Sequence, residues 1–310
     1  MKQIKQIVFS LLILFIWLLF VILTFNESDS AKNDLKEHNE KIYNLWGQEY
    51  IGELEDVKSS KIIRVAILDS GIDKTHKEFK GLNFKEYNAI TPTKPIIDEL
   101  GHGTAVTGII ASKGIEISGI TRKLELYDVK VLNEKGTGEI ENVIQGIEWC
   151  IQQDVDVINI SFGFSSNQES LKNVINKALG ANIVIVAASG NTLGLSVDYP
   201  AKYDGVLSIS SFDESLKLDP LSAKGKIDFS APGVNIVSTN NLGGYSNFSG
   251  TSYATAFATG AIAALMIRDS AFLDNENIKL SLRNHVIDLG KKGYDDHFGF
   301  GVITLKKEIR

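Results

Sequence analysis

Four short runs of the chain are apolar at most positions, and no other feature restricts the fold so strongly. They cover residues 62–68, 155–160, 183–188 and 205–210 and are rich in valine and isoleucine. A strand with one face in water alternates apolar and polar residues, whereas a strand covered on both faces does not. The four runs are therefore predicted to be buried strands of one parallel sheet.

Helical periodicity appears between these runs, most clearly over residues 139–152. Strands that alternate with helices are typical of a sheet covered on both sides. We expect an α/β fold with a doubly wound, mostly parallel sheet and helices on both faces. No internal repeat or low-complexity linker divides this part of the chain, so residues 42–310 are predicted to form one domain.

A different segment precedes this domain, because residues 7–25 are apolar except for Ser10 and Thr24. Nineteen residues of helix span roughly 28 Å, close to the hydrocarbon thickness of a bilayer. Two lysines precede the run and acidic residues follow it. The positive-inside rule then predicts an uncleaved transmembrane signal-anchor with residues 1–6 in the cytoplasm and the rest of the chain outside.

A cleaved signal peptide, cut between Ser28 and Ala31, is the competing interpretation of this segment. It would give a secreted protein, but it requires a shorter apolar region and a small-residue pair at its end, which the sequence lacks. Residues 26–41 follow, and eight of the fifteen residues from Glu27 to Lys41 are charged. Such a composition predicts a solvated stalk.

Charge and cysteine content exclude several classes of protein. The formal net charge is −6, and no basic cluster is present that could neutralise phosphates, so we expect no nucleic-acid partner. Cys150 is the single cysteine, which excludes an internal disulfide and leaves no thiolate cluster for a metal. The predicted signal-anchor makes the cytoplasmic membrane an expected partner, while the oligomeric state is open.

Three polar residues, each within two positions of a glycine, mark the places where chemistry is expected. Asp69 ends the first apolar run, His102 lies between two glycines, and Ser252 follows a Gly-Thr pair. Taken singly, each has an ordinary structural explanation: Asp69 as a residue of a strand-to-loop turn, His102 as a packed histidine and Ser252 as a helix cap. Taken together, an acid, a base and a hydroxyl are the groups that an activated serine nucleophile requires.

The chain resembles the subtilases, the subtilisin-like serine proteases of peptidase family S8, from about Tyr43 to Ile303. The three catalytic segments match, in the order Asp, His, Ser that this family uses, and so do residues 187–191, 230–233 and 298–301. The resemblance implies that Ser252 attacks the scissile carbonyl, His102 transfers the proton and Asp69 orients the imidazole. It also implies that Asn191 donates its amide to the oxyanion.

The same resemblance implies where the substrate binds. Subtilases hold an extended peptide between two backbone segments, which correspond here to Ser161, Phe162 and Gly163 and to Gly136, Thr137 and Gly138. Asp198 stands where a small residue usually forms the base of the pocket for the residue before the cut. A carboxylate there predicts cleavage after arginine or lysine. The alternative is an ordinary turn residue before Tyr199 and Pro200.

Subtilases commonly bind calcium, but this sequence departs from their pattern. The loop after Ala111 is shorter than the calcium-binding loop of secreted subtilisins, and Glu78 stands where they carry a ligand aspartate. Ca²⁺ takes six to eight oxygen ligands in a loop that wraps it. We therefore expect no metal and no cofactor.

The short segment between the predicted signal-anchor and the predicted domain suggests a dedicated processing enzyme. Only seventeen residues separate Phe25 from Tyr43, too few for a folding prodomain between them. A membrane-anchored subtilase of this kind resembles the leader peptidases of lantibiotic clusters. The alternatives are a broad-specificity secreted subtilisin and a catalytically silent, membrane-tethered scaffold that binds peptides.

Overall fold

The apolar runs form the centre of a nine-stranded sheet with the order β10-β11-β7-β6-β5-β4-β1-β3-β2. The computed structural model describes residues 43–52, 59–269 and 275–306. All strand pairs of this sheet are parallel except β10 with β11. A separate antiparallel hairpin joins β8 and β9. The strands are β1 Ile63–Asp69, β2 Phe84–Asn88, β3 Leu124–Lys130, β4 Val157–Ile160, β5 Val184–Ala188, β6 Leu207–Phe212, β7 Phe229–Pro232, β8 Ile236–Thr239, β9 Tyr245–Phe248, β10 Val286–Ile287 and β11 Val302–Ile303.

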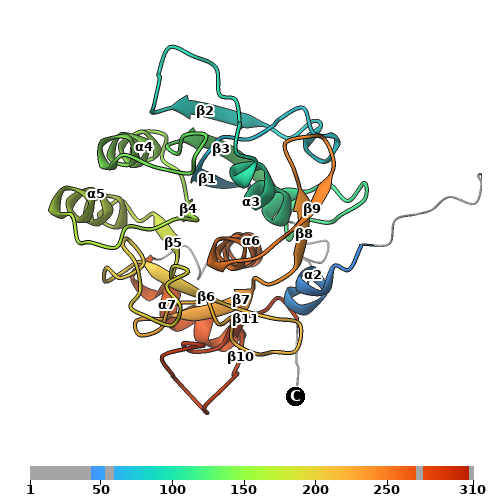
Figure 1. Ribbon diagram of the computed structural model, residues 1–310, viewed down its shortest axis with the longest axis vertical. Helices are drawn as coiled ribbons and strands as arrows, with labels where there is room; N and C mark the ends of the chain where they lie inside the picture. Colours follow the sequence, from blue (N-terminus) through green and yellow to red (C-terminus); the bar gives the residue numbers. More distant parts are fainter. Residues whose placement is uncertain (1–42, 53–58, 270–274, 307–310) are drawn as a thin grey trace, which may run out of the picture. The chain divides into compact units, whose positions relative to one another are not determined.

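Helices cover both faces of the sheet, as Figure 1 shows: α4 and α5 lie on one face, and α3 and α6 lie on the other. Two separate apolar cores correspond to these two faces. The α-helices are α2 Trp46–Ile51, α3 His102–Ala111, α4 Ile140–Gln152, α5 Glu169–Gly180, α6 Thr251–Arg268 and α7 Asn275–Leu282, and the 3-10 turns are η1 Lys77–Phe79 and η3 Arg283–His285. The predicted α/β fold with a mostly parallel sheet is confirmed.

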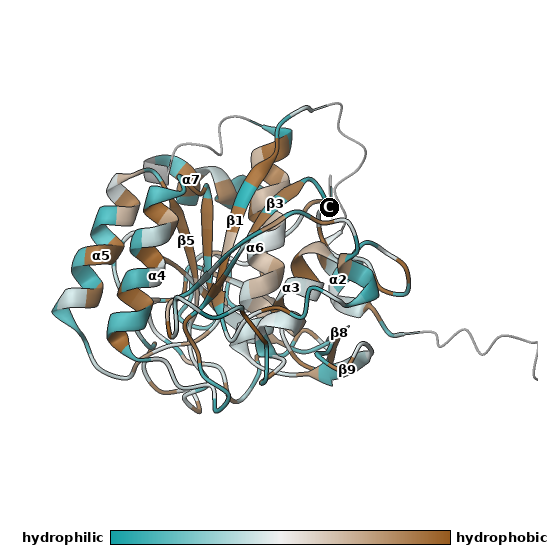
Figure 2. Ribbon diagram, turned by 90° about the horizontal axis from the view of Figure 1, so that it is seen from above, coloured by the Kyte–Doolittle hydropathy of each residue, from teal (hydrophilic) through white to brown (hydrophobic). Residues whose placement is uncertain are grey.

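The helices differ in how deeply they are buried. In α4 and α5 one side is apolar and the other polar, which is the pattern of a helix that lies between a sheet and water (Figure 2). In α6, by contrast, every residue from Tyr253 to Ile267 is buried, because this helix packs against the sheet, α2 and α3 at once. A nucleophile at the beginning of α6 is therefore carried by a rigid element.

The register of the central strands brings several loops to one edge of the sheet. Leu68 pairs with Ile160, and Ile160 pairs with Ala187, so β1, β4 and β5 end at the same level. Ligands of open α/β sheets bind beyond the carboxyl ends of the strands, near the point where the strand order reverses. Here β1 lies at that point, between β3 and β4.

The chain divides into two units, Met1–Ile42 and Tyr43–Arg310, and every described residue belongs to the second. The predicted cytoplasmic residues 1–6, signal-anchor 7–25 and stalk 26–41 lie outside the described residues. None of the described helices combines the length and hydropathy that crossing a bilayer requires.

Candidate active site

The pair formed by Asp69 and His102 lies at the carboxyl ends of the central strands. Asp69 is the last residue of β1 and His102 the first of α3, after Gly101 in the left-handed region at φ 84°. The Nδ1 atom of His102 lies 2.7 Å and 2.9 Å from the two carboxylate oxygens of Asp69. The Ser70 amide donates to one of those oxygens at 2.8 Å. Asp69 is 1% exposed, so this carboxylate is fully committed to orienting the imidazole.

The electrostatics of His102 suit a general base. Burial alone would lower the pKa of His102, but the charge and hydrogen bond of Asp69 raise it, and Asp98 adds to the rise. The pKa of His102 therefore lies above its ordinary value of 6.5. With Nδ1 bound to Asp69, the Nε2 atom is the one left for proton transfer.

Asp98 is a buried carboxylate that the sequence analysis missed. Its side chain accepts hydrogen bonds from the Ser70 hydroxyl at 2.7 Å, the Gly101 amide at 2.7 Å, and the Thr104 hydroxyl and amide at 2.6 Å and 3.0 Å. The Ser70 hydroxyl in turn accepts from the Gly103 amide. Asp98 thus joins the loop after β1 to the beginning of α3.

Ser252 lies in the first turn of α6, where the first amides of a helix have no acceptor within the helix. Its hydroxyl donates to the Ser161 carbonyl at 2.5 Å, and the Ser161 hydroxyl donates to the Ser252 carbonyl at 3.1 Å. The beginning of α6 is therefore tied to the end of β4. To donate to Nε2 of His102, the hydroxyl must therefore turn away from the Ser161 carbonyl.

Asn191 is placed to act as a hydrogen-bond donor. Its side-chain oxygen accepts from the amide and hydroxyl of Thr251, at 3.1 Å and 3.2 Å. These two bonds fix the orientation of the Asn191 side-chain amide and leave its Nδ2 atom to donate. A Cβ on Gly250, whose φ is 138°, would lie only 2.9 Å from that nitrogen, so a glycine is required at this position. Nδ2 of Asn191 and the amide of Ser252 can together bind an oxyanion.

The two predicted substrate segments flank β1. Ser161, Phe162 and Gly163 follow β4, and Gly136, Thr137 and Gly138 follow β3, the two strands that pair with β1. The second segment is a tight turn in which the side chain of Asn133 accepts from the amides of Lys135 and Thr137. The topology is therefore compatible with an extended peptide between the two segments.

Asp198 lies against the backbone at the ends of two neighbouring strands. A Cβ on Gly163, after β4, would lie 2.6 Å from the Cβ of Asp198, and a Cβ on Gly190, after β5, would lie 2.9 Å from its carboxyl carbon. None of the described residues forms a hydrogen bond or ion pair with this carboxylate. Burial raises the pKa of Asp198, and the charge of Lys202 offsets part of the rise.

A cavity of about 340 Å³ opens beside His102. The ring of Tyr253 lies 5.6 Å from the imidazole and 5.1 Å from the ring of Phe248, so aromatic side chains form its floor. The cavity is lined by Leu100, Gly101, His102, Asn240, Asn241, Leu242, Ser246, Phe248 and Tyr253.

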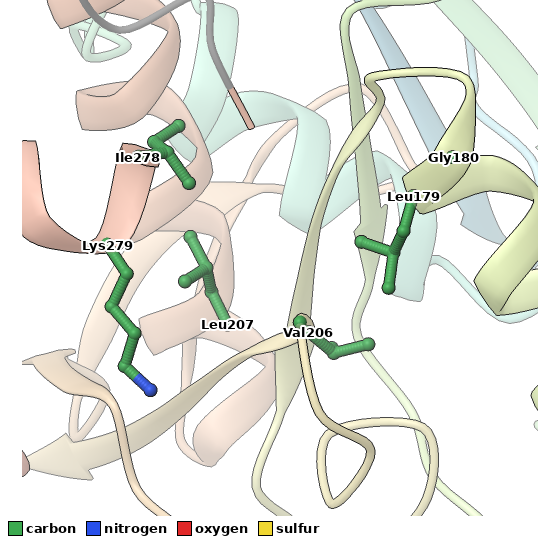
Figure 3. Close-up of a pocket in the computed structure, with 7 residues that line it drawn as sticks. Leu179, Gly180, Val206, Leu207, Ile278 and Lys279 are labelled. Carbon is green, nitrogen blue, oxygen red and sulfur yellow. The ribbon is translucent and has the colours of Figure 1, made fainter. Parts of the chain in front are cut away.

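A second cavity, of about 350 Å³, lies away from these residues, between α5, β6 and α7 (Figure 3). Leucine, isoleucine and valine side chains line it, and its charged residue, Lys279, forms an ion pair with Asp228. It offers neither a nucleophile nor an acid-base pair. The reactive groups are therefore those at the carboxyl edge of the sheet.

The described residues contain one cluster of potential metal ligands, Asp295, Asp296 and His297. The carboxylate of Asp295 already accepts from the amides of Lys291, His297 and Phe298. These bonds lower the pKa of Asp295, although its burial acts the other way. The cluster is explained as a loop held together by its own carboxylate.

Comparisons with known proteins agree with this geometry. Residues 60–301 match the model of the subtilase family. The chain is 38% identical over 254 residues to the minor extracellular protease Epr of Bacillus subtilis, and this match covers 81% of the chain and 39% of Epr. It is 37% identical over 253 residues to subtilisin amylosacchariticus of B. subtilis subsp. amylosacchariticus, covering 79% of the chain and 65% of that protein.

A solved structure shows the same likeness. Sphericase superposes with a TM-score of 0.77 at 25% identity, over 84% of this chain and 98% of that one. The chain spans about two fifths of the length of Epr and just under two thirds of the subtilisin.

Proposed function

The chain belongs to the subtilase family, and from this premise we propose that it is a serine endopeptidase that hydrolyses peptide bonds through an acyl-enzyme. The observation that carries the proposal is the bond between Asp69 and His102 at the sheet edge where Ser252 and Asn191 also lie. The relatives named above are called proteases or subtilisins, which supports the same activity.

The residues suggest a definite sequence of proton transfers. The Ser252 hydroxyl turns toward His102, gives its proton to Nε2 and attacks the scissile carbonyl. The oxyanion that forms is held by the Ser252 amide and by Nδ2 of Asn191. When the intermediate collapses, the C–N bond breaks and His102 returns the proton to the departing amine. Water, activated by His102, then cleaves the acyl-enzyme and regenerates Ser252.

The carboxylate of Asp198 supports a preference for arginine or lysine before the cut. It lies against Gly163, in one of the segments that would hold the peptide, and no described residue pairs with it. A cation close to a partly desolvated carboxylate gains roughly 1 to 4 kcal/mol at effective dielectric constants between water and the protein surface. An apolar side chain in the same place would leave the charge poorly solvated.

We further propose that the enzyme is anchored in the cytoplasmic membrane and processes peptides outside it, such as the leader of a lantibiotic-type precursor. The apolar residues 7–25, the two lysines before them and the charged residues 26–41 support the anchor. External protease added to intact cells should then remove the catalytic unit and leave a tag before Lys2 protected. Recovery of all activity in the medium, with a new N-terminus near Ala31, would instead establish a secreted subtilisin.

Active-site labelling tests the activity directly. A fluorophosphonate probe should label the full-length wild type and fail to label Ser252→Ala. Ser249→Ala is the matched control, because Ser249 is exposed, lies three residues away and its hydroxyl accepts only a loop amide, that of Asn235. This variant should label like the wild type. Absence of labelling in a folded wild type would favour the peptide-binding scaffold.

A further inference from the structure

Glu78 lies in η1 with none of its surface exposed, although it is a charged residue. Its carboxylate accepts five hydrogen bonds. Four come from the consecutive amides of residues 114–117, at 2.7 to 3.2 Å, and one from the Tyr245 hydroxyl at 2.7 Å. We call this arrangement the Glu78 cage. A buried carboxylate with this many donors is fully compensated.

The loop that forms the cage is the one in which subtilases commonly bind calcium. Here its amides, and not its carbonyls, point at Glu78, and the carbonyl of Ile117 is already taken by the amide of Gly114. Ca²⁺ takes six to eight oxygen ligands, whereas consecutive N–H groups form a concavity for an anion. The residues around Glu78 therefore do not fit a calcium ion.

We propose that the Glu78 carboxylate replaces this calcium ion, as an internal anion that holds the loop after α3 against β9 without any metal. Compared with a calcium site, the charges are reversed: a negative carboxylate lies in the centre, and the loop supplies hydrogen-bond donors around it. This proposal rests on family membership and on the described contacts, and it does not depend on the proposed protease activity.

The surrounding residues extend the cage toward the active site. His76 is 1% exposed, and its Nδ1 accepts from the Glu78 amide at 3.2 Å, so Nε2 carries the proton that is donated to the Gly244 carbonyl at 3.0 Å. Gly244 and Tyr245 belong to the hairpin of β8 and β9. Five other residues of this hairpin line the cavity beside His102: Asn240, Asn241, Leu242, Ser246 and Phe248. The cage thus fixes the base of one wall of the candidate active site.

The charge of Glu78 is maintained by these bonds. Burial alone would raise the pKa of Glu78, but the amides of the loop and the Tyr245 hydroxyl lower it below its ordinary value. A carboxyl whose pKa is lower in the folded state stabilises the fold above its unfolded pKa, and this contribution is lost as the pH falls through the folded pKa. The cage therefore persists into acid that protonates ordinary carboxylates.

Thermal unfolding tests the proposal in the full-length Ser252→Ala protein, which cannot digest itself. The Tm should be the same in EDTA and in excess CaCl₂, and equilibrium dialysis with Ca²⁺ alone should show no tight binding. Glu78→Gln should lower the Tm by about 5 °C or more under both conditions, because it removes a charged acceptor from buried donors. Tyr245→Phe removes one donor and should cause a smaller loss in a protein that still folds.

Glu116→Gln provides the matched control, because this carboxylate is on the same loop but is exposed and pairs with Lys77 at the surface. Its Tm should stay close to that of the parent. The proposal is overturned if chelation lowers the Tm and Ca²⁺ restores it, or if Glu78→Gln and Tyr245→Phe behave like Glu116→Gln.

Discussion

Two aspartates near the candidate active site contrast in how their charge is used. Asp69 is 1% exposed, and both of its oxygens are held by His102 and the Ser70 amide. Asp198 is partly exposed, and no described residue donates to it or pairs with it. A buried carboxylate whose two oxygens are both hydrogen-bonded inside the protein positions its partners, whereas a partly exposed carboxylate without a hydrogen-bond partner is available to a ligand. This contrast supports the proposal that Asp69 belongs to the catalytic machinery and Asp198 to substrate recognition.

The same isosteric change at the two aspartates gives the largest expected contrast. Asp69→Asn should lower kcat by about 10⁴-fold for every substrate, the order already known for loss of this aspartate in serine proteases, this family included. The amide cannot stabilise the imidazolium or hold the correct tautomer. Asp198→Asn should leave kcat for substrates with an uncharged residue before the cut close to that of the wild type. Burst kinetics with matched ester substrates measure the activity of both variants. A loss of activity on every substrate in Asp198→Asn would contradict the different roles given to the two aspartates.

Asn191 offers a second position whose effect should not depend on the substrate. Asn191→Ala should lower kcat by about 10²- to 10³-fold, the magnitude known for this family's oxyanion donor. KM should change little, since the donor acts on charge that develops during the reaction. The matched control is Asn133→Ala, because the Asn133 side chain holds the turn of the substrate segment formed by residues 136–138. That variant should affect KM more than kcat, and the reverse result would contradict the roles given to the two asparagines.

Acidification should separate the effect of His102 on activity from the effect of Asp198 on specificity. Activity on any substrate falls as the pH drops through the raised pKa of His102, because the protonated imidazole cannot act as a base. The ratio of kcat/KM for arginine to that for glutamine cancels this effect. Since burial raises the pKa of Asp198, this ratio should fall at a pH above the ordinary titration of an aspartate. A ratio that stays constant through this range would show that Asp198 does not contact the substrate.

Much of the fold could be predicted because buried parallel strands leave a clear apolar pattern. The run at residues 183–188 became β5, Val184–Ala188, and the helical pattern at 139–152 became α4, Ile140–Gln152. Seven of the described strands lie outside the four predicted runs: β2, β3, β7, β8, β9, β10 and β11. Among them, β2 and β9 carry no apolar run because both are partly exposed and rich in polar residues. Their formation depends on pairing with β3 and β8, which local sequence does not reveal.

The candidate site shows the same limit. Asp69, His102 and Ser252 could be predicted because each lies within two positions of a glycine in a segment typical of the family. Asp98 could not be distinguished from an ordinary loop aspartate until its four donors were seen. The cage around Glu78 depends on the direction of backbone amides, which no side-chain pattern records.

The most direct test of the assigned roles is the preference of the wild type and of Asp198→Asn for the residue before the cut. Matched peptides that differ only in having arginine, glutamine, leucine or phenylalanine at that position would be compared by kcat/KM. The wild type should prefer arginine to glutamine by roughly ten- to several-hundred-fold, and Asp198→Asn should bring the two close to parity. If leucine or phenylalanine exceeds arginine in the wild type, or if the variant keeps the same ratio, Asp198 is only a turn residue and the distinction between the two aspartates fails.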